Sequence, residues 1–243
     1  MNNQHTIEKM KQMRLGGMAQ MHHTNTSNNL NQDYTIDQYV AMLVDQEWEA
    51  RQNRKIENLI KSARFRFPAT IRDIDYSVNR QLDKNTFERL ATLDFVRNRE
   101  NLIITGATGT GKSYLAQALG HQACMMLMKT KYYNTARLMD HFKLSRLEGN
   151  YPKSLKEIEK TDLLILDDFG LNAFDNQARQ ALMDVIESIY DRRSVIISSQ
   201  VPVSAWHDLI GEGTIADAIL DRVVHSSHRI QLKGESLRKN KLK

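Results

Sequence analysis

An eight-residue segment in the middle of the chain carries residue types that bind phosphate groups. It reads Gly-Ala-Thr-Gly-Thr-Gly-Lys-Ser and fits the spacing G-x-x-x-x-G-K-[ST], between an apolar run and a helical pattern. Glycines let successive backbone N–H groups converge on phosphate oxygens, and the start of the helix adds a positive dipole. The alternative is a glycine turn without a nucleotide. The candidate nucleotide contacts are Gly106, Ala107, Thr108, Gly109, Thr110, Gly111, Lys112, Ser113 and Tyr114.

Within this segment, two side chains have separate expected tasks. Lys112 is expected to reach the β- and γ-phosphates, and Ser113 is expected to ligate Mg²⁺. Two adjacent acids follow a second apolar run, 163–166. Asp167 is expected at the carboxyl end of a buried strand, where it can hold Mg²⁺, and Asp168 is placed to orient or deprotonate the attacking water. The alternative is that the two acids cap the next helix.

Polar residues also follow the apolar run 194–197. Ser198, Ser199 and Gln200 are candidates to contact the γ-phosphate or the attacking water, and an ordinary strand-end turn is the alternative. The guanine signature N-K-x-D does not occur in the sequence, which favours ATP over GTP. A phosphate loop and an acidic strand alone do not separate a motor-type ATPase from a small-molecule kinase.

The elements that must position these residues begin at about position 68. Apolar runs alternate with helical patterns there, which indicates an α/β fold of the P-loop NTPase kind, with a parallel sheet and helices on both faces. Strands are expected at 101–105, 131–134, 162–166, 194–198 and 228–232, and helices at 112–128, 135–147 and 175–192.

The first 66 residues have a different character. Apolar residues recur at helical spacing from Ile7 to Met21 and again within 35–65, which predicts an all-helical region. The polar, Asn-rich segment His22–Gln32 between them predicts a linker. The adjacent pair His22 and His23 could suggest a metal, but without acidic or cysteine partners at ligand spacing a loop role is favoured.

Charge is concentrated in two places. The chain has a formal net charge of +5, and segments 51–66 and 229–243 each hold six Lys/Arg against one Glu. Such concentrations suit a polyanionic partner, whereas the alternative is a solvated helix face and a frayed tail. The candidate DNA contacts are Arg51, Arg54, Lys55 and Lys61.

Other global features narrow the class of protein. The 243 residues contain one cysteine, Cys124, which argues against a disulfide framework and fits a reducing cytoplasm. No apolar run approaches the roughly 20 residues that span a bilayer, and the N-terminus lacks the pattern of a secretory signal. We therefore expect a cytoplasmic chain with no membrane contact.

Four segments, taken in order, resemble one known family. These are GATGTGKS, LLILDDFG, VIISSQVPVSAW and AILDRVVHSSHRIQLKGESLRK, and together they resemble the IstB family of transposase-helper ATPases. This family is related to the DnaC-like helicase loaders within the AAA+ class. The likeness covers nearly the whole chain, and the second pair of segments is more specific than the phosphate loop.

The resemblance implies a role for several residues. Positions 106–113 match the Walker A loop, Asp167 and Asp168 the Walker B pair, and Gln200 with Ser199 the sensor 1 position. Arg222 matches an arginine that relatives supply to a neighbouring subunit's ATP, and a surface salt bridge is the alternative. The chain departs from the wider AAA+ class in three ways. The second Walker B acid is Asp where Glu is commoner, and the sensor 1 residue is Gln or Ser where Asn is usual. The helical lid is also missing. Arg238 could imitate a lid arginine, although a basic tail is favoured.

The expected organisation has three parts. Residues 1–66 form a helical domain for DNA or partner binding and assembly, 67–233 the AAA+ core without a C-terminal lid domain, and 234–243 a basic tail. The resemblance implies an ATP-hydrolysing helper of a transposase, which assembles on double-stranded DNA as a homo-oligomer with ATP and Mg²⁺. The alternatives are a loader of a replicative helicase and, further off, a small-molecule P-loop kinase.

Overall fold

The computed structural model describes residues 3–28 and 34–237 and confirms the expected fold class, an α/β chain with a parallel sheet after an N-terminal helical region. The chain divides into two compact units, Met1–Asn58 and Leu59–Lys243. The division falls within a long helix, α3 (Ile36–Ala63).

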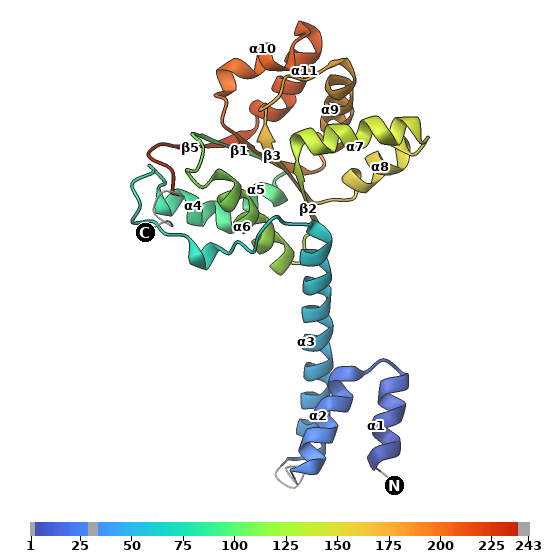
Figure 1. The fold of residues 1–243 in the computed structure, drawn as a ribbon. Helices are drawn as coiled ribbons and strands as arrows, with labels where there is room; N and C mark the ends of the chain where they lie inside the picture. Colours follow the sequence, from blue (N-terminus) through green and yellow to red (C-terminus); the bar gives the residue numbers. More distant parts are fainter. Residues whose placement is uncertain (1–2, 29–33, 238–243) are drawn as a thin grey trace. The chain divides into compact units, whose positions relative to one another are not determined.

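In the first unit, α1 (Asn3–Gln12) and α2 (Gly16–Ser27) precede α3 (Figure 1). Gly17 lies so close to α3 that a Cβ atom would come within 2.7 Å of the Gln46 carbonyl oxygen. The Glu47 carboxylate accepts hydrogen bonds from the backbone N–H groups of Gly17 (2.8 Å) and Met18 (3.3 Å). Burial alone would raise the pKa of Glu47, but hydrogen bonds from Arg51 and these two N–H groups lower it. Glu47 therefore satisfies the otherwise unpaired first turn of α2.

The linker expected at His22–Gln32 is wrong for its first part, because His22–Ser27 form the second half of α2. Asn25 is buried there, and Nδ1 of His22 lies 2.7 Å from the Tyr39 hydroxyl of α3. These contacts with α3 hold a polar helix that the local sequence does not favour. Residues 29–33 lie outside the described part of the chain.

The second unit contains a five-stranded parallel sheet in the order β2-β3-β4-β1-β5. Every strand expected from an apolar run is present, with ends that differ by up to three residues. The strands are β1 (Asn101–Gly106), β2 (Thr130–Asn134), β3 (Leu163–Phe169), β4 (Ser194–Ser199) and β5 (Ser227–Leu232).

Helices connect the strands, as the parallel arrangement requires. The helices expected after β1, β2 and β3 are present as α6, α7 and α9. The full set is α4 (Lys84–Ala91), α5 (Asp94–Arg97), α6 (Lys112–Met125), α7 (Thr135–Leu147), α8 (Tyr151–Glu159), α9 (Asn176–Ile189), α10 (Trp206–Ile210) and α11 (Gly213–Val224), with short 3₁₀ turns at Ile71–Asp73 and Val203–Ala205.

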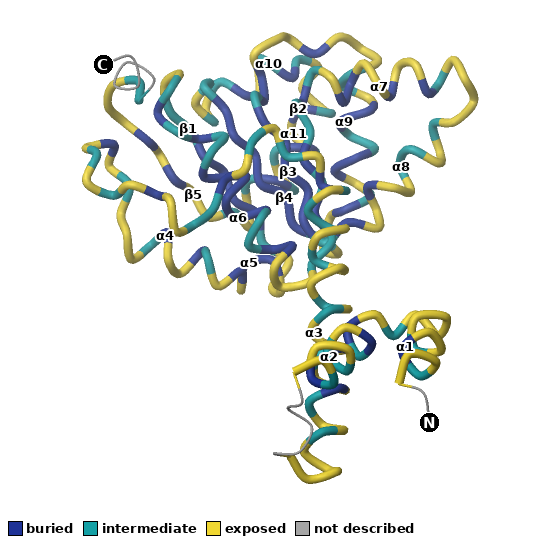
Figure 2. The backbone as a smooth tube through the Cα atoms, turned by 60° about the horizontal axis from the view of Figure 1, so that its bottom comes forward, coloured by how far each residue is buried: buried dark blue, intermediate teal, exposed yellow. Residues whose placement is uncertain are grey.

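Both faces of the sheet are apolar and covered. In β3, Leu164 and Leu166 pack against α7 to α11, whereas Leu163 and Ile165 pack against α4 to α6. Figure 1 shows these two helical layers on opposite sides of the strands, and Figure 2 shows that the buried residues concentrate in the strands between them. A strand buried on both faces needs consecutive apolar residues, which explains the run Leu163–Leu166.

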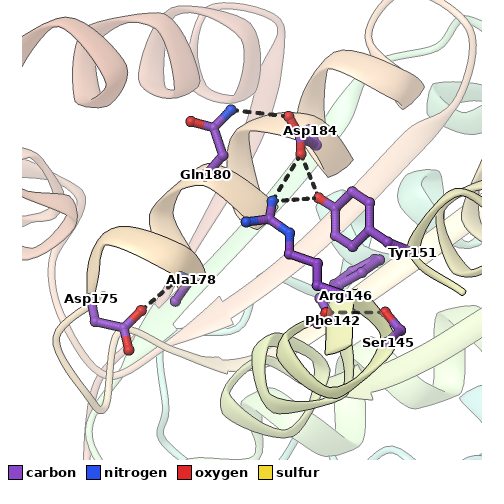
Figure 3. Close-up of polar contacts among 8 residues, drawn as sticks. All are labelled: Phe142, Ser145, Arg146, Tyr151, Asp175, Ala178, Gln180 and Asp184. Atoms are coloured by element: carbon purple, nitrogen blue, oxygen red, sulfur yellow. Dashed lines mark hydrogen bonds and ion pairs between the residues drawn. The ribbon is translucent and has the colours of Figure 1, made fainter. Parts of the chain in front are cut away.

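A polar cluster joins three helices of one layer (Figure 3). The Arg146 guanidinium lies 3.3 Å from the Asp184 carboxylate and 4.4 Å from the centroid of the Tyr151 ring, and the Tyr151 hydroxyl also donates to Asp184. Gln180 adds a 3.2 Å hydrogen bond to the same carboxylate. These contacts link α7, α8 and α9 at the surface.

Among the described helices, none is long and apolar enough to cross a membrane.

Candidate nucleotide site

The loop between β1 and α6 needs glycine at three positions. Gly106, Gly109 and Gly111 have φ values of +153°, +82° and +97°, in a region that other residues rarely adopt. A Cβ atom on Gly106 would also lie 2.5 Å from the Leu232 carbonyl oxygen. The amino end of α6 follows at Lys112, so its unpaired N–H groups face the loop. This geometry suits an anion such as a phosphate group.

The loop is also held by its own side chains. Nζ of Lys112 donates to the Ala107 carbonyl oxygen at 2.8 Å, and the Thr110 hydroxyl donates to the same oxygen at 2.9 Å. Both Lys112 and Thr110 are buried. The lysine charge is therefore fixed inside the loop, where a phosphate chain can reach it.

The loop borders a cavity of about 970 Å³. One section of its lining is apolar, and there the rings of Phe67 and Tyr114 stack with centroids 6.0 Å apart and planes 12° apart. Such a wall suits a planar base. The polar section includes Thr108, Lys112, Ser113, Asp168 and Gln200, so the cavity brings together residues of the phosphate loop, the acid pair and the end of β4.

Asp167 is fully buried in β3 and carries three hydrogen bonds from hydroxyl groups. Oδ1 accepts from Ser113 at 2.8 Å and from Ser198, and Oδ2 accepts from Tyr132 at 2.7 Å. A hydroxyl and a carboxylate at this spacing are the oxygen donors that Mg²⁺ prefers, and Mg²⁺ keeps several waters in such sites. Ser113 and Asp167 therefore fit a magnesium ion that also binds nucleotide phosphates.

Asp168 follows in a left-handed conformation, with φ of +55°. The ladder between β3 and β4 shifts register between Leu166 and Phe169, so the two acids occupy an irregular part of the strand. The Asn134 amide donates to Oδ2 of Asp168 at 3.1 Å. Burial raises the pKa of Asp168, and the charge of Asp167 adds to this effect. A carboxylate with a raised pKa in a nucleotide cavity suits the acceptance of a proton from water.

Of the candidates at the end of β4, Ser199 and Gln200 differ in position. Gln200 lines the cavity, and its side-chain oxygen accepts a hydrogen bond from the Thr108 hydroxyl. Ser199 is fully buried, and its hydroxyl donates to the Phe169 carbonyl oxygen at 2.7 Å and accepts from the Val201 N–H. The structure therefore places Gln200 in the cavity and Ser199 in the strand packing behind it.

Arg222 does not lie at the cavity. It sits at the end of α11, where its guanidinium lies 3.0 Å from the Glu187 carboxylate and 5.5 Å from the centroid of the Tyr190 ring. Its carbonyl oxygen accepts from the side chain of Asn101, the first residue of β1. The phosphate loop follows the opposite end of β1, about 17 Å away at the usual rise per residue.

The candidate DNA contacts of α3 are exposed. Arg51, however, forms a 2.7 Å ion pair with Glu47 and also reaches the carbonyl oxygen of Arg14, so it supports the packing of the first unit. Arg54, Lys55 and Lys61 are also exposed. Arg238 lies outside the described residues.

Three contacts of the acid pair were not expected from the sequence, namely those of Tyr132, Asn134 and Ser198. Tyr132 and Asn134 are two residues apart in β2, and Asn134 pairs in register with Asp167. Residues two apart in a strand lie on the same face, so the sequence could have predicted that both side chains lie on one side of the sheet, next to the acidic strand. Ser198 was expected at the γ-phosphate or the attacking water, but its buried hydroxyl donates to Asp167 instead.

The known proteins that this chain resembles are described as ATP-binding proteins. The family described as IstB-like ATP binding protein matches residues 8–243. The chain belongs to this family. An insertion sequence ATP-binding protein of Sinorhizobium fredii is 42% identical over 97% of this chain and 96% of its own length. The IS1162 ATP-binding protein of Pseudomonas fluorescens is 37% identical over 84% of this chain and 89% of its own length.

Solved structures share the fold of this IstB-like protein at low sequence identity. The DnaC helicase loader has a TM-score of 0.52 at 19% identity, over 65% of this chain and 95% of that chain. AMPPCP-bound DnaA from Aquifex aeolicus has a TM-score of 0.57 at 15% identity, over 74% of this chain and 56% of that chain. At these identities the likeness establishes a shared α/β fold and nothing finer.

Proposed function

We propose that this IstB-like protein is an ATP-hydrolysing, DNA-binding helper of the transposase encoded by an insertion sequence. ATP binding drives assembly of several copies on double-stranded DNA, the assembly recruits the transposase, and hydrolysis resets it. The observation that carries the proposal is the acid pair beside the phosphate loop, with Asp167 fixed by Ser113 and Asp168 open to the nucleotide cavity. Family membership supplies the insertion-sequence setting.

The residues of the cavity divide the hydrolytic step among them. Lys112 neutralises the β- and γ-phosphates, and the loop N–H groups orient them. Asp168 accepts a proton from the water that attacks the γ-phosphorus, while the bond from that phosphorus to the β–γ bridging oxygen breaks. Gln200, held by Thr108, donates from its amide to the γ-phosphate or to the water. Mg²⁺ held by Ser113 and Asp167 supplies charge neutralisation when bound.

Arg222 supports assembly, because it cannot serve the phosphate loop of its own chain. It lies at the start of β1, whereas the loop lies at its end. A partly exposed guanidinium fixed by Glu187 and Tyr190 suits the charge of another subunit's γ-phosphate. We therefore assign Arg222 to the site of a neighbouring copy.

The direct test measures ATP hydrolysis, sedimentation and transposase binding with and without duplex DNA. We expect ATP and DNA together to give large assemblies, and we expect DNA to change the rate of ATP hydrolysis. The transposase encoded by the same insertion sequence should bind only the assembled form. Preferential binding to a replicative helicase would favour a helicase loader. Transfer of the γ-phosphoryl group to a small molecule, with no response to DNA, would favour a kinase. The relatives from insertion sequences favour the transposase helper.

A further inference from the structure

An arginine that the sequence did not single out borders the nucleotide cavity. Arg80 is only 4% exposed and lies between the segment before α4 and the phosphate loop. Its guanidinium packs against Gly111, where a Cβ atom would come within 2.6 Å of Nη1. Its backbone is fixed as well, since its N–H donates to Val78 and its carbonyl oxygen accepts from Lys233. The side chain is thus held in place before any ligand binds.

Within the described part of the chain, the guanidinium of Arg80 forms no ion pair with a carboxylate. It donates to two backbone carbonyl oxygens, of Asp75 at 3.0 Å and of Thr110 at 3.4 Å, and its Nε has no acceptor among the described residues. Burial lowers the pKa of this arginine, although the group stays charged. Other partly buried arginines of the unit do pair with carboxylates, namely Arg146, Arg179, Arg193 and Arg222.

A buried charge that forms no ion pair is costly. The nearby charge of Asp75 offsets part of this cost for Arg80, and an anion in the cavity would relieve more of it. Arg80 contacts Thr110 and packs against Gly111, at the helix end of the loop. Gln200 instead contacts Thr108, and Asp168 contacts Asn134. Arg80 therefore shares no contact with the two residues expected to act at the γ-phosphate.

We propose that Arg80 is a second phosphate-binding cation of the nucleotide site, acting within its own chain on the phosphates that ATP and ADP share. The proposal rests on nucleotide binding at the phosphate loop, as in the proposed function. Arg80 retains nucleotide before and after hydrolysis, whereas Arg222 acts on the γ-phosphate and Lys112 on both the β- and γ-phosphates. It thereby supplies a cation to the nucleotide site from a segment that precedes the loop.

The test compares Arg80→Met and Arg80→Lys with Arg72→Met, an exposed arginine of the same segment that does not line the cavity. Dissociation constants are measured for ATP, ADP and adenosine, together with the unfolding temperature without ligand. We expect Arg80→Met to weaken ATP and ADP equally, by about ten- to a hundredfold, which is the range of one charge-assisted hydrogen bond. Adenosine affinity and unfolding temperature should change little, and Arg80→Lys should fall between Arg80→Met and the wild type.

Other outcomes would overturn the assignment in distinct ways. An arginine that only clamps the loop would lower the unfolding temperature and weaken adenosine as much as ADP. Loss of ATP affinity with unchanged ADP affinity would show that Arg80 binds the γ-phosphate instead. If Arg80→Met does not fold, unchanged ATP and ADP affinities in Arg80→Lys, which lacks the forked guanidinium, would contradict the proposal. Failure of the wild type to bind ATP would instead overturn the proposed function.

Discussion

The hydroxyl of Tyr132 in β2 donates a 2.7 Å hydrogen bond to Oδ2 of Asp167 in β3, on the side of the carboxylate opposite Ser113. Burial and the Asp167 charge raise the pKa of Tyr132, so it stays a neutral donor. This contact fixes the carboxylate so that Oδ1 faces Ser113. Tyr132 is therefore a positioning residue for the magnesium site.

We predict that Tyr132→Phe raises the Mg²⁺ concentration for half-maximal ATP hydrolysis by about tenfold, as is usual when a partner of a metal ligand is removed. The free energy of unfolding should fall by about 1–3 kcal/mol, because one buried acceptor loses its donor. Titration of activity with Mg²⁺ and thermal unfolding measure both effects. Tyr133→Phe, on the opposite face of β2, is the control. Equal Mg²⁺ requirements in both variants would contradict the role of Tyr132.

Variants of Lys112 and Asp168 should separate ATP binding from ATP hydrolysis. Lys112→Ala removes the full positive charge that the loop itself contributes, so tight ATP binding should be abolished. Asp168→Asn keeps the shape of the side chain but cannot accept the water's proton, so ATP should bind while hydrolysis stops. Nucleotide affinity and steady-state hydrolysis are measured for both variants. An equal loss of ATP affinity in both would refute this division.

The sequence predicted the sheet well and the acid pair only in part. Runs such as Leu163–Leu166 are apolar because both faces of the strand are covered, and that signal is local. The register shift after Leu166 and the positive φ of Asp168 depend on neighbouring strands, so no local pattern reveals them. In the sequence, Tyr132 has no feature that separates it from other strand residues, because only the pairing of β2 with β3 brings its hydroxyl to Asp167.

The N-terminal helices show a second limit. The polar second half of α2 is helical because His22 and the buried Asn25 pack against α3, while Glu47, thirty residues from Gly17, satisfies the first turn. Apolar residues recur at helical spacing along α3, and Leu43 is buried. This spacing did not reveal that Val40, Val44 and Trp48 stay exposed, since a helical repeat alone does not say which faces are covered.

Arg222 should act across a subunit boundary. Arg222→Ala alone should bind ATP but hydrolyse it slowly. Mixing it with Asp168→Asn subunits should restore part of the activity, because some boundaries then combine an intact arginine with an intact acid. Glu187→Gln, which removes the ion pair but keeps the arginine, is the control and should retain most activity. No recovery at any mixing ratio, despite confirmed co-assembly, would argue that Arg222 is structural.

The hydrogen bond from Asn134 should set the acidic limit of hydrolysis. Burial and Asp167 raise the pKa of Asp168, whereas the Asn134 amide lowers it by stabilising the charged form. Hydrolysis needs the deprotonated acid, so activity should fall as the pH drops through this pKa. Asn134→Ser removes the amide but can still cap α7, and it should move the limit to higher pH. Profiles of rate against pH measure the shift, and an unchanged acidic limb would exclude Asp168 as the titrating base.

DNA binding should depend on the exposed cations of α3. Lys and Arg side chains that neutralise phosphates release counterions, so affinity should fall steeply with salt and vary little with sequence. Arg54→Ala with Lys55→Ala should weaken duplex binding and reduce the salt slope by about one unit for each phosphate that is no longer neutralised. ATP binding should be unchanged, because the nucleotide cavity lies in the second unit.

Arg51→Ala provides the contrast for this experiment. It breaks the ion pair with Glu47 and the hydrogen bond to the Arg14 carbonyl oxygen, so it should lower the unfolding temperature as well as any DNA affinity. The double variant should keep the wild-type unfolding temperature, because its side chains are exposed on α3. Affinity is measured by fluorescence anisotropy over a range of salt concentrations. A double variant that fails to assemble but keeps its salt slope would assign this face to protein contacts instead of DNA.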